Sequence, residues 1–283
     1  MRRVRVFLEM IKFEHTVFAL PFAYLGMILA ARGIPELRVI VWATVAMVAA
    51  RTLAMAVNRL ADRHFDSRNP RTADRALPRG LLEPRFVVFA SLISLAVFEF
   101  AAWQLNRFVF VMSPLALIFL LGYHFTKRFT WLSHWVLGFT DGIAAVGGWA
   151  AVRGSLDAPA FVLWFAVTVW IAGFDLIYSC QDVHVDRRER LHSVPSRLGV
   201  GFALWLAKIN HALTVVALVC VGIMTHMTWP YWIGVASVTV LIIYENMVVN
   251  EHDLSRLDFA FFNINGYISV TLFAATLAAV LLP

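Results

Sequence analysis

Long apolar runs separated by short polar breaks dominate the sequence. A helix that crosses a bilayer needs about 20 mostly apolar residues, and about nine runs approach that length. They cover residues 14–31, 38–57, 85–103, 108–125, 134–152, 159–178, 200–224, 230–248 and 260–281. A membrane β-barrel would instead show alternating segments of about ten residues. The pattern therefore predicts an all-α integral membrane protein with about nine transmembrane helices, in a single membrane domain over residues 1–283.

Composition supports this prediction. Hydrophobic residues make up 60% of the chain and charged residues 15%, with a mean hydropathy of +0.73, whereas a soluble domain carries about 25% charged residues. The N-terminal sequence MRRVRVFLEMIKFEHT has charges throughout and no small-residue cleavage site. We interpret it as a basic cytoplasmic lead-in rather than a removable signal.

Positive charges indicate the orientation. Arginine and lysine gather before the first run and in every second connection, most densely in residues 59–84 and 179–199. The positive-inside rule then places the N-terminus and these two connections in the cytoplasm, and we expect the cell (inner or plasma) membrane. The two long connections follow the second and sixth runs, which hints at two four-helix units around a central cavity, with the ninth helix added.

Two sets of polar residues recur at helical spacing where the second and sixth runs end. The first is Asn58, Asp62 and Asp66, which continue the helix face of Arg51 seven residues earlier, and the second is Asp175, Tyr178, Asp182 and Asp186. Residues three or four apart share one face of a helix, so each set forms a stripe if its helix continues past the apolar run. Ordinary helix-end charges that reach for the headgroups are the alternative. Two stripes on one side of the bundle favour a shared site.

Paired acids among many arginines favour a metal–diphosphate site. Mg²⁺ prefers oxygen ligands and usually binds through one or two carboxylates plus substrate phosphates. The connection RNPRTADRALPRG supplies arginines that would neutralise the remaining phosphate charge. An apolar tail on the diphosphate would lie in the bundle or the bilayer, so the pattern indicates a prenyl diphosphate.

The sequences NRLADRHFDSRNPRTADRALPRG and DLIYSCQDVHVDRRERLHSVPSRLG resemble the two aspartate-rich motifs of the UbiA superfamily of intramembrane prenyltransferases. KFEHTVFALPFAYLG and YHFTKRFT extend the resemblance, which is greatest to 4-hydroxybenzoate polyprenyltransferases and related menaquinone-pathway enzymes. It implies Mg²⁺-assisted loss of diphosphate, an allylic cation and attack by an aromatic ring carbon. Many members have Asn-Asp where this chain has Asn58-Arg59, so the ligand set of the first metal stays open.

The resemblance also assigns roles to individual residues. Those expected to bind metal are Asp62, Asp66, Asp182 and Asp186. Those expected to bind diphosphate are Asn58, Arg59, Arg71, Arg75, Tyr123, Lys127 and Arg128. For the last two, ordinary anchoring of a cytoplasmic connection is the alternative.

Three residues are expected to act in catalysis. Arg51 lies about two turns inside the second run, where a cation is usually functional. A carboxylate on the aromatic acceptor would give Arg51 a partner; the alternative is an internal salt bridge to Asp175 or Asp141. Asp175 would accept the acceptor's hydroxyl proton, and Tyr178 would shield the allylic cation.

The predicted partners are a polyprenyl diphosphate, a small aromatic acid and membrane lipid, with no nucleic acid. Prenyl transfer to haem or chlorophyll is a less favoured alternative, because those acceptors need not carry the small carboxylate that Arg51 is expected to bind. A cation transporter is the alternative from another class. A transporter places its acids near the midplane of the membrane, whereas Asp62, Asp66, Asp182 and Asp186 lie at the cytoplasmic mouth with arginines around them.

Overall fold

In a computed structural model, the chain is described over residues 2–12, 16–251, 254, 256–257 and 263–282. A short helix precedes the bundle, α1 (Arg2–Met10). The bundle helices that follow are α2 (Thr16–Ala31), α3 (Leu37–Arg68), α4 (Pro84–Leu105), α5 (Arg107–Thr126), α6 (Ser133–Arg153), α7 (Ala158–Tyr178), α10 (Val200–Met224), α11 (Trp229–Val248) and α12 (Asn265–Leu281). A 3₁₀ turn (Ser179–Asp182), α8 (Val183–Arg188) and α9 (Val194–Leu198) connect α7 to α10. The all-α prediction is confirmed.

Seven helical segments in the described part of the chain are long and apolar enough to cross a bilayer. They are α3, α4, α5, α6, the segment Ala158–Arg188, α10 and α11. The first and ninth predicted runs correspond to shorter apolar helices, Leu20–Ala31 and Asn265–Leu281. Residues 14–15 and 260–262 of those two runs lie outside the described residues. The count of nine transmembrane helices is therefore not confirmed.

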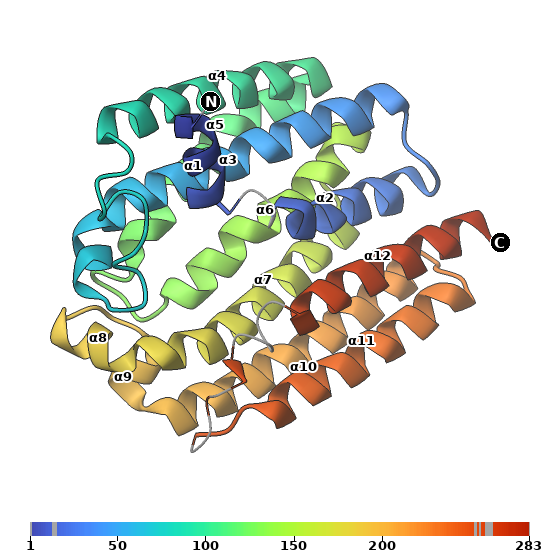
Figure 1. Cartoon of the computed structure of the whole chain (residues 1–283). Helices are drawn as coiled ribbons and strands as arrows, with labels where there is room; N and C mark the ends of the chain where they lie inside the picture. The colour runs from blue at the N-terminus through green and yellow to red at the C-terminus, as the bar shows by residue number, and fades with distance from the viewer. Residues whose placement is uncertain (1, 13–15, 252–253, 255, 258–262, 283) are drawn as a thin grey trace.

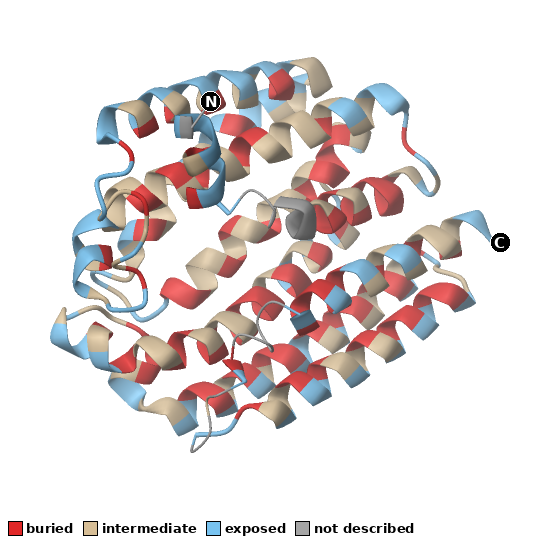
Figure 2. Ribbon diagram, in the orientation of Figure 1, coloured by how far each residue is buried: buried red, intermediate tan, exposed pale blue. Residues whose placement is uncertain are grey.

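Large apolar side chains cover the outer surface of the bundle. Phe89 of α4, Ile118 of α5 and Val240 of α11 are each at least 61% exposed. Buried residues concentrate on the inward faces of the helices, as Figure 2 shows for α6, α7 and α10. A soluble monomer rarely exposes extensive apolar patches, so this surface is suited to contact with membrane lipid.

The helices form a closely packed arrangement in which α6 and α7 lie between two groups (Figure 1). Helices α3, α4 and α5 lie on one side, and α10, α11 and α12 lie on the other. Helix α2 packs against α6, where a Cβ on Gly26 would meet the backbone of Ala145 and a Cβ on Gly148 would meet the backbone of Ala23. Small residues at these two points let the helix backbones approach one another.

Polar caps fix where the helices end. Asn106 accepts a hydrogen bond from the Val109 N–H in the first turn of α5, and it donates to the carbonyls of Ala150 and Ala151 in the last turn of α6. One amide thereby caps the first turn of α5 and ties it to the last turn of α6, whose Ala150 carbonyl also accepts from the Gly154 N–H.

A cavity of about 1330 Å³ lies within the bundle. Its wall is mostly apolar and comes from α1 to α7 and from the start of α12; neither α10 nor α11 contributes a lining residue. The two groups of helices thus border the cavity unequally, and the arrangement as two four-helix units stays a prediction. Polar lining residues include Arg59, Arg71, Arg75, Asp175 and Tyr178, which belong to the ends of α3 and α7 and to the connection after α3.

Candidate active site

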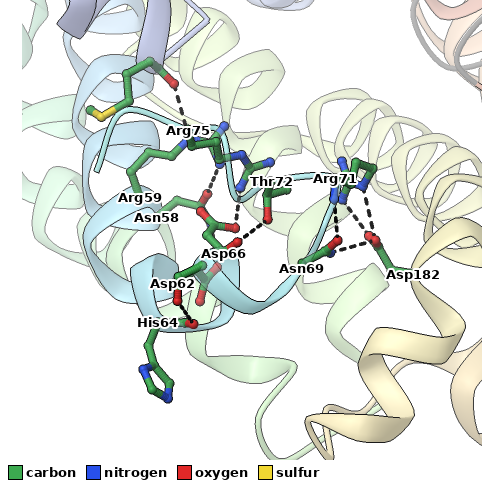
Figure 3. A network of polar contacts seen from close by, with 12 residues as sticks. Asn58, Arg59, Asp62, His64, Asp66, Asn69, Arg71, Thr72, Arg75 and Asp182 are labelled. Atoms are coloured by element: carbon green, nitrogen blue, oxygen red, sulfur yellow. Dashed lines mark hydrogen bonds and ion pairs between the residues drawn. The ribbon is translucent and has the colours of Figure 1, made fainter. Parts of the chain in front are cut away.

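The first motif, residues 58–66, lies on the last turns of α3. The helix continues past its apolar part as far as Arg68, so Asn58, Asp62 and Asp66 lie on successive turns of one face, as the spacing predicts. Asn58 Nδ2 donates to Asp62 Oδ2 at 3.1 Å. Figure 3 shows this face turned toward the connection that follows α3.

The second motif, residues 175–186, is not one continuous α-helix, and the expectation of an unbroken stripe is wrong. Helix α7 ends at Tyr178, and a 3₁₀ turn over Ser179–Asp182 precedes α8. Side chains account for the break, because Ser179 Oγ bonds the carbonyl of Leu176 and Gln181 Nε2 bonds that of Tyr178. Such local bonds compete with regular helix. As a result, the carboxylates of this motif take different partners.

Each of the four aspartates predicted to bind metal forms an ion pair with a residue predicted to bind diphosphate. The pairs and their N–O distances are Asp62–Arg128 at 3.4 Å, Asp66–Arg75 at 2.6 Å, Asp182–Arg71 at 2.7 Å and Asp186–Lys127 at 2.8 Å. The partners come from the connections after α3 and α5, so the fold gathers three distant stretches of sequence. Four carboxylates and four cations thus balance one another, and two of these residues, Arg71 and Arg75, line the cavity.

Arg71 links the two motifs. It extends from the connection after α3 to Asp182, as Figure 3 shows, and its Nη1 donates to the Tyr178 hydroxyl at 3.2 Å. Its guanidinium carbon lies 5.5 Å from the centre of the Tyr178 ring. Burial alone would lower the pKa of Arg71, but the hydrogen bonds and the charge of Asp182 outweigh it and raise the pKa above its ordinary value. Arg71 is therefore a permanent cation at the cavity opening.

The carboxylates fit a magnesium ion held jointly with a phosphate. No group of three or more His, Cys, Asp or Glu side chains comes together among the described residues. Mg²⁺ needs only one or two carboxylates when substrate phosphates and water complete its shell. Asp66 Oδ2 is buried one turn from Asp62 and makes no hydrogen bond with any residue in the described ranges. This spare hard-oxygen donor is the type of ligand that Mg²⁺ prefers.

Arg59 makes its hydrogen bonds away from the acidic pairs. Its Nε donates to the Met10 carbonyl at the end of α1 at 3.2 Å, and its Nη1 donates to Asn58 Oδ1 at 3.1 Å. The residue also lines the cavity and is 8% exposed. In this structure Arg59 ties α1 to α3, so its predicted contact with diphosphate would require it to exchange partners.

Arg51 lines the cavity together with Tyr123 and Asp141. Its Nε is buried and makes no hydrogen bond. Across the described ranges, Arg51 forms no ion pair within 4.0 Å, with Asp175, Asp141 or any other acid. The internal salt bridge that was the alternative for this residue is absent from the described part of the chain, although Asp141 lines the same cavity and its charge acts on Arg51 from a greater distance.

Asp175 has a partner that the sequence did not reveal. His134 Nδ1 lies 2.6 Å from Asp175 Oδ2, and the imidazole is almost fully buried. One signal was present, because His134 precedes Asp141 by seven residues and so shares its face of α6. A single histidine in an apolar run gives no further hint. Asn69 was missed as well; its Nδ2 donates to Asp182 Oδ1 at 3.2 Å.

Comparison with known proteins decides the family. The sequence profile of the UbiA prenyltransferase family matches residues 19–267, which is most of the chain and includes both motifs. The chain belongs to the UbiA prenyltransferase family.

Relatives of this UbiA protein agree with the assignment. A 4-hydroxybenzoate octaprenyltransferase from Tolumonas auensis is 29% identical over 252 residues, which span 89% of this chain and 87% of the relative. The apo structure of a UbiA homologue from Aeropyrum pernix superimposes with a TM-score of 0.86 at 31% identity, covering 93% of this chain and 97% of the other. A UbiA homologue from Archaeoglobus fulgidus bound to GPP and Mg²⁺ shares the fold, with a TM-score of 0.71 at 18% identity over 98% of this chain and all of the other.

The UbiA protein is thus a prenyltransferase and a multi-pass membrane protein.

Proposed function

We propose that the protein transfers a polyprenyl group from a prenyl diphosphate to a ring carbon of a small hydroxylated aromatic carboxylate in respiratory quinone synthesis. The acceptor is 4-hydroxybenzoate, or otherwise a dihydroxynaphthoate. One observation carries the proposal: four aspartate–cation pairs, two of whose arginines line the cavity, accompany a cavity arginine, Arg51, that forms no ion pair with any described residue. The names of relatives such as the Tolumonas enzyme support 4-hydroxybenzoate.

The diphosphate would bind where the four ion pairs meet. Bound Mg²⁺ would be held by Asp62, Asp66, Asp182 and Asp186 and would stabilise the charge that develops on the leaving diphosphate. The cations released from those carboxylates are Arg71, Arg75, Lys127 and Arg128, and they would turn to the phosphate oxygens. Arginine suits this role because its planar fork bonds two phosphate oxygens at once.

The apolar wall of the cavity would hold the first isoprene units and keep water from the reacting carbon. Phe119, Phe139 and Phe174 are among its lining residues. An allylic cation is consumed by any water that reaches it, so a dry wall protects the reaction. Tyr178, which lines the cavity beside Arg71, would face the cation with its ring.

The acceptor would lie deeper, between Arg51 and Asp175. Its carboxylate would pair with the Arg51 guanidinium, and its hydroxyl would donate to Asp175. In the transfer, the bond between prenyl C1 and the diphosphate oxygen breaks and its electron pair leaves with diphosphate. A ring carbon bonds to C1, and the ring loses one proton. Asp175 favours this step by drawing the hydroxyl proton, which makes the ring richer in electrons.

The orientation supports access from the cytoplasm. Both motifs and both cationic connections lie on the side to which the positive-inside rule assigns the cytoplasm. We propose the cell (inner or plasma) membrane as the location, with the diphosphate entering from the cytoplasmic face.

A panel assay tests the function. Purified protein in lipid nanodiscs would receive Mg²⁺, one of geranyl to octaprenyl diphosphate, and either 4-hydroxybenzoate or a dihydroxynaphthoate. We expect a C-prenylated product from 4-hydroxybenzoate that disappears when a chelator removes Mg²⁺. Heat protection by prenyl diphosphate with Mg²⁺ reports binding independently. Protection without product from any of these acceptors would overturn the proposed acceptor class.

A further inference from the structure

We infer that His134 is a positioning residue for prenyl transfer, which holds the Asp175 carboxylate so that one of its oxygens faces the aromatic acceptor. The inference rests on the proposed function, because it concerns how Asp175 meets the acceptor hydroxyl. It adds a residue from the start of α6 to a site otherwise built by α3, α7 and the connections after α3, α5 and α7.

Two hydrogen bonds fix the imidazole from opposite sides. Nδ1 lies 2.6 Å from Asp175 Oδ2, and Nε2 lies 3.2 Å from the backbone nitrogen of Val194. Val194 is the first residue of α9, and the N–H of a first helical residue has no partner within its own helix. His134 is 1% exposed, so neither bond competes with water.

These contacts determine where the proton lies. The Val194 N–H can only donate, so Nε2 must be unprotonated to accept it. A neutral imidazole carries one proton, which is then on Nδ1 and points at Asp175. A protonated imidazolium would place two N–H groups against each other at Val194. The fold thus favours the tautomer of His134 whose Nδ1–H donates to Asp175.

The two carboxylate oxygens of Asp175 consequently have different surroundings. Oδ2 accepts from His134, whereas Oδ1 makes no hydrogen bond to any residue that the structure describes. The side chain is 22% exposed and lines the cavity. The free oxygen is therefore the one available to an acceptor hydroxyl, and the bond to His134 keeps the carboxylate from rotating away from it.

His134 also connects the acceptor side of the site to the diphosphate side. Ser193, next to Val194, donates through Oγ to Asp186 Oδ2 at 2.7 Å, and Asp186 pairs with Lys127. The stretch that bonds His134 Nε2 is thus the same stretch that orients the second motif. A histidine held at both nitrogens keeps Asp175 at a fixed separation from that motif, as transfer between two bound substrates requires.

A merely structural histidine would make the same contacts, so the test separates the two bonds. In His134→Asn the amide nitrogen takes the place of Nδ1 and can still donate to Asp175. In His134→Gln the amide group reaches the place of Nε2 and can bond Val194 instead. We expect H134A and H134Q to lower kcat/KM for 4-hydroxybenzoate roughly 10-fold or more, and H134N to recover most of the loss. The KM for prenyl diphosphate should stay within about twofold in all three variants.

A double-mutant cycle with Asp175→Asn provides the second measurement. If His134 acts through Asp175, H134A in the D175N background should add almost nothing to the loss from D175N alone. Thermal melting with prenyl diphosphate and Mg²⁺ confirms that each variant is folded and binds its first substrate.

Three results would overturn the inference: rescue by Gln but not by Asn, an equal loss from H134A in both backgrounds, or unchanged acceptor kinetics. Failure of the proposed function looks different, because the wild-type protein itself would then prenylate none of the acceptors.

Discussion

Lys127 Nζ lies 2.8 Å from Asp186 Oδ1 and joins the connection after α5 to α8. The carboxylate side chain is 2% exposed and the ammonium side chain 31%. The partly exposed lysine can turn to an incoming phosphate, whereas the buried carboxylate cannot turn to water. Lys127 therefore serves both the resting site and the proposed diphosphate site.

Lys127→Ala should weaken prenyl diphosphate binding and lower stability in detergent. The buried Asp186 loses its cation, and an unsatisfied buried acceptor costs about 1–3 kcal/mol. Binding measured by calorimetry should be weaker in the variant, and its dependence on salt should be shallower, because one phosphate contact has gone. Lys208→Ala is the matched control, since Lys208 is an exposed lysine of α10 outside the cavity. Equal effects of both substitutions would refute the assignment.

Asp62→Asn and Asp182→Asn should each reduce transfer about 100-fold or more without unfolding the protein. A metal at developing charge contributes several kcal/mol, and each 1.4 kcal/mol is a factor of ten in rate. The rate of diphosphate release in nanodiscs measures the loss.

Glu189→Gln provides the control for these two substitutions. Glu189 also pairs with arginines, Arg68 at 3.1 Å and Arg188 at 3.2 Å, but neither arginine is among those proposed to bind diphosphate. Its variant should keep near-normal turnover. The metal assignment fails if Asp62→Asn or Asp182→Asn does the same.

Arg51→Leu should raise the KM for 4-hydroxybenzoate and leave the KM for prenyl diphosphate unchanged. A hydrogen bond to a charged group contributes about 1.5–3 kcal/mol, which predicts a loss of roughly 10- to 100-fold in acceptor kcat/KM. The uncharged analogue 4-hydroxybenzamide is the matched probe, because it should lose far less between wild type and variant. A similar loss for acid and amide would show that Arg51 does not bind the carboxylate.

The sequence predicted the helical segments and the polar residues of the site better than their contacts. Hydrophobic length alone located the helices, and helical spacing located the first motif because α3 does continue to Arg68. The end of helix α7 at Tyr178 was not predicted, because it depends on hydrogen bonds from the side chains of Ser179 and Gln181 to carbonyls of the preceding turn. Spacing along one element carries no information about such local competition.

The ion pairs and hydrogen bonds between distant segments could not be predicted from the sequence, for another reason. Composition indicated that arginines would balance aspartates, but only the folded chain shows that Arg75 takes Asp66 and Arg71 takes Asp182. His134 is the extreme case, since its role follows wholly from two tertiary hydrogen bonds.

Arg59→Leu should loosen α1 more than it weakens diphosphate binding. The substitution removes the donor to the Met10 carbonyl, a polar contact that joins α3 to the end of α1 beside the apolar packing of Phe7 and Met10 against Ala56. Hydrogen exchange over residues 3–11 should become faster, while exchange in α4 stays unchanged as an internal control. Unaltered exchange in α1 together with a large rise in the KM for prenyl diphosphate would instead show that Arg59 binds the diphosphate.

Gly148→Ala should destabilise the bundle, whereas Gly147→Ala should not. A Cβ on Gly148 would meet the backbone of Ala23 in α2, but a Cβ on Gly147 has nothing within 4 Å. Backbone atoms cannot move aside as a flexible side chain can, so α2 and α6 must separate, and overpacking of this kind costs about 1–3 kcal/mol. Alanine at position 147 adds helix propensity without a clash. Thermal melting in the same detergent compares the neighbours directly, and equal melting temperatures would show that α2 and α6 are not in the close contact described.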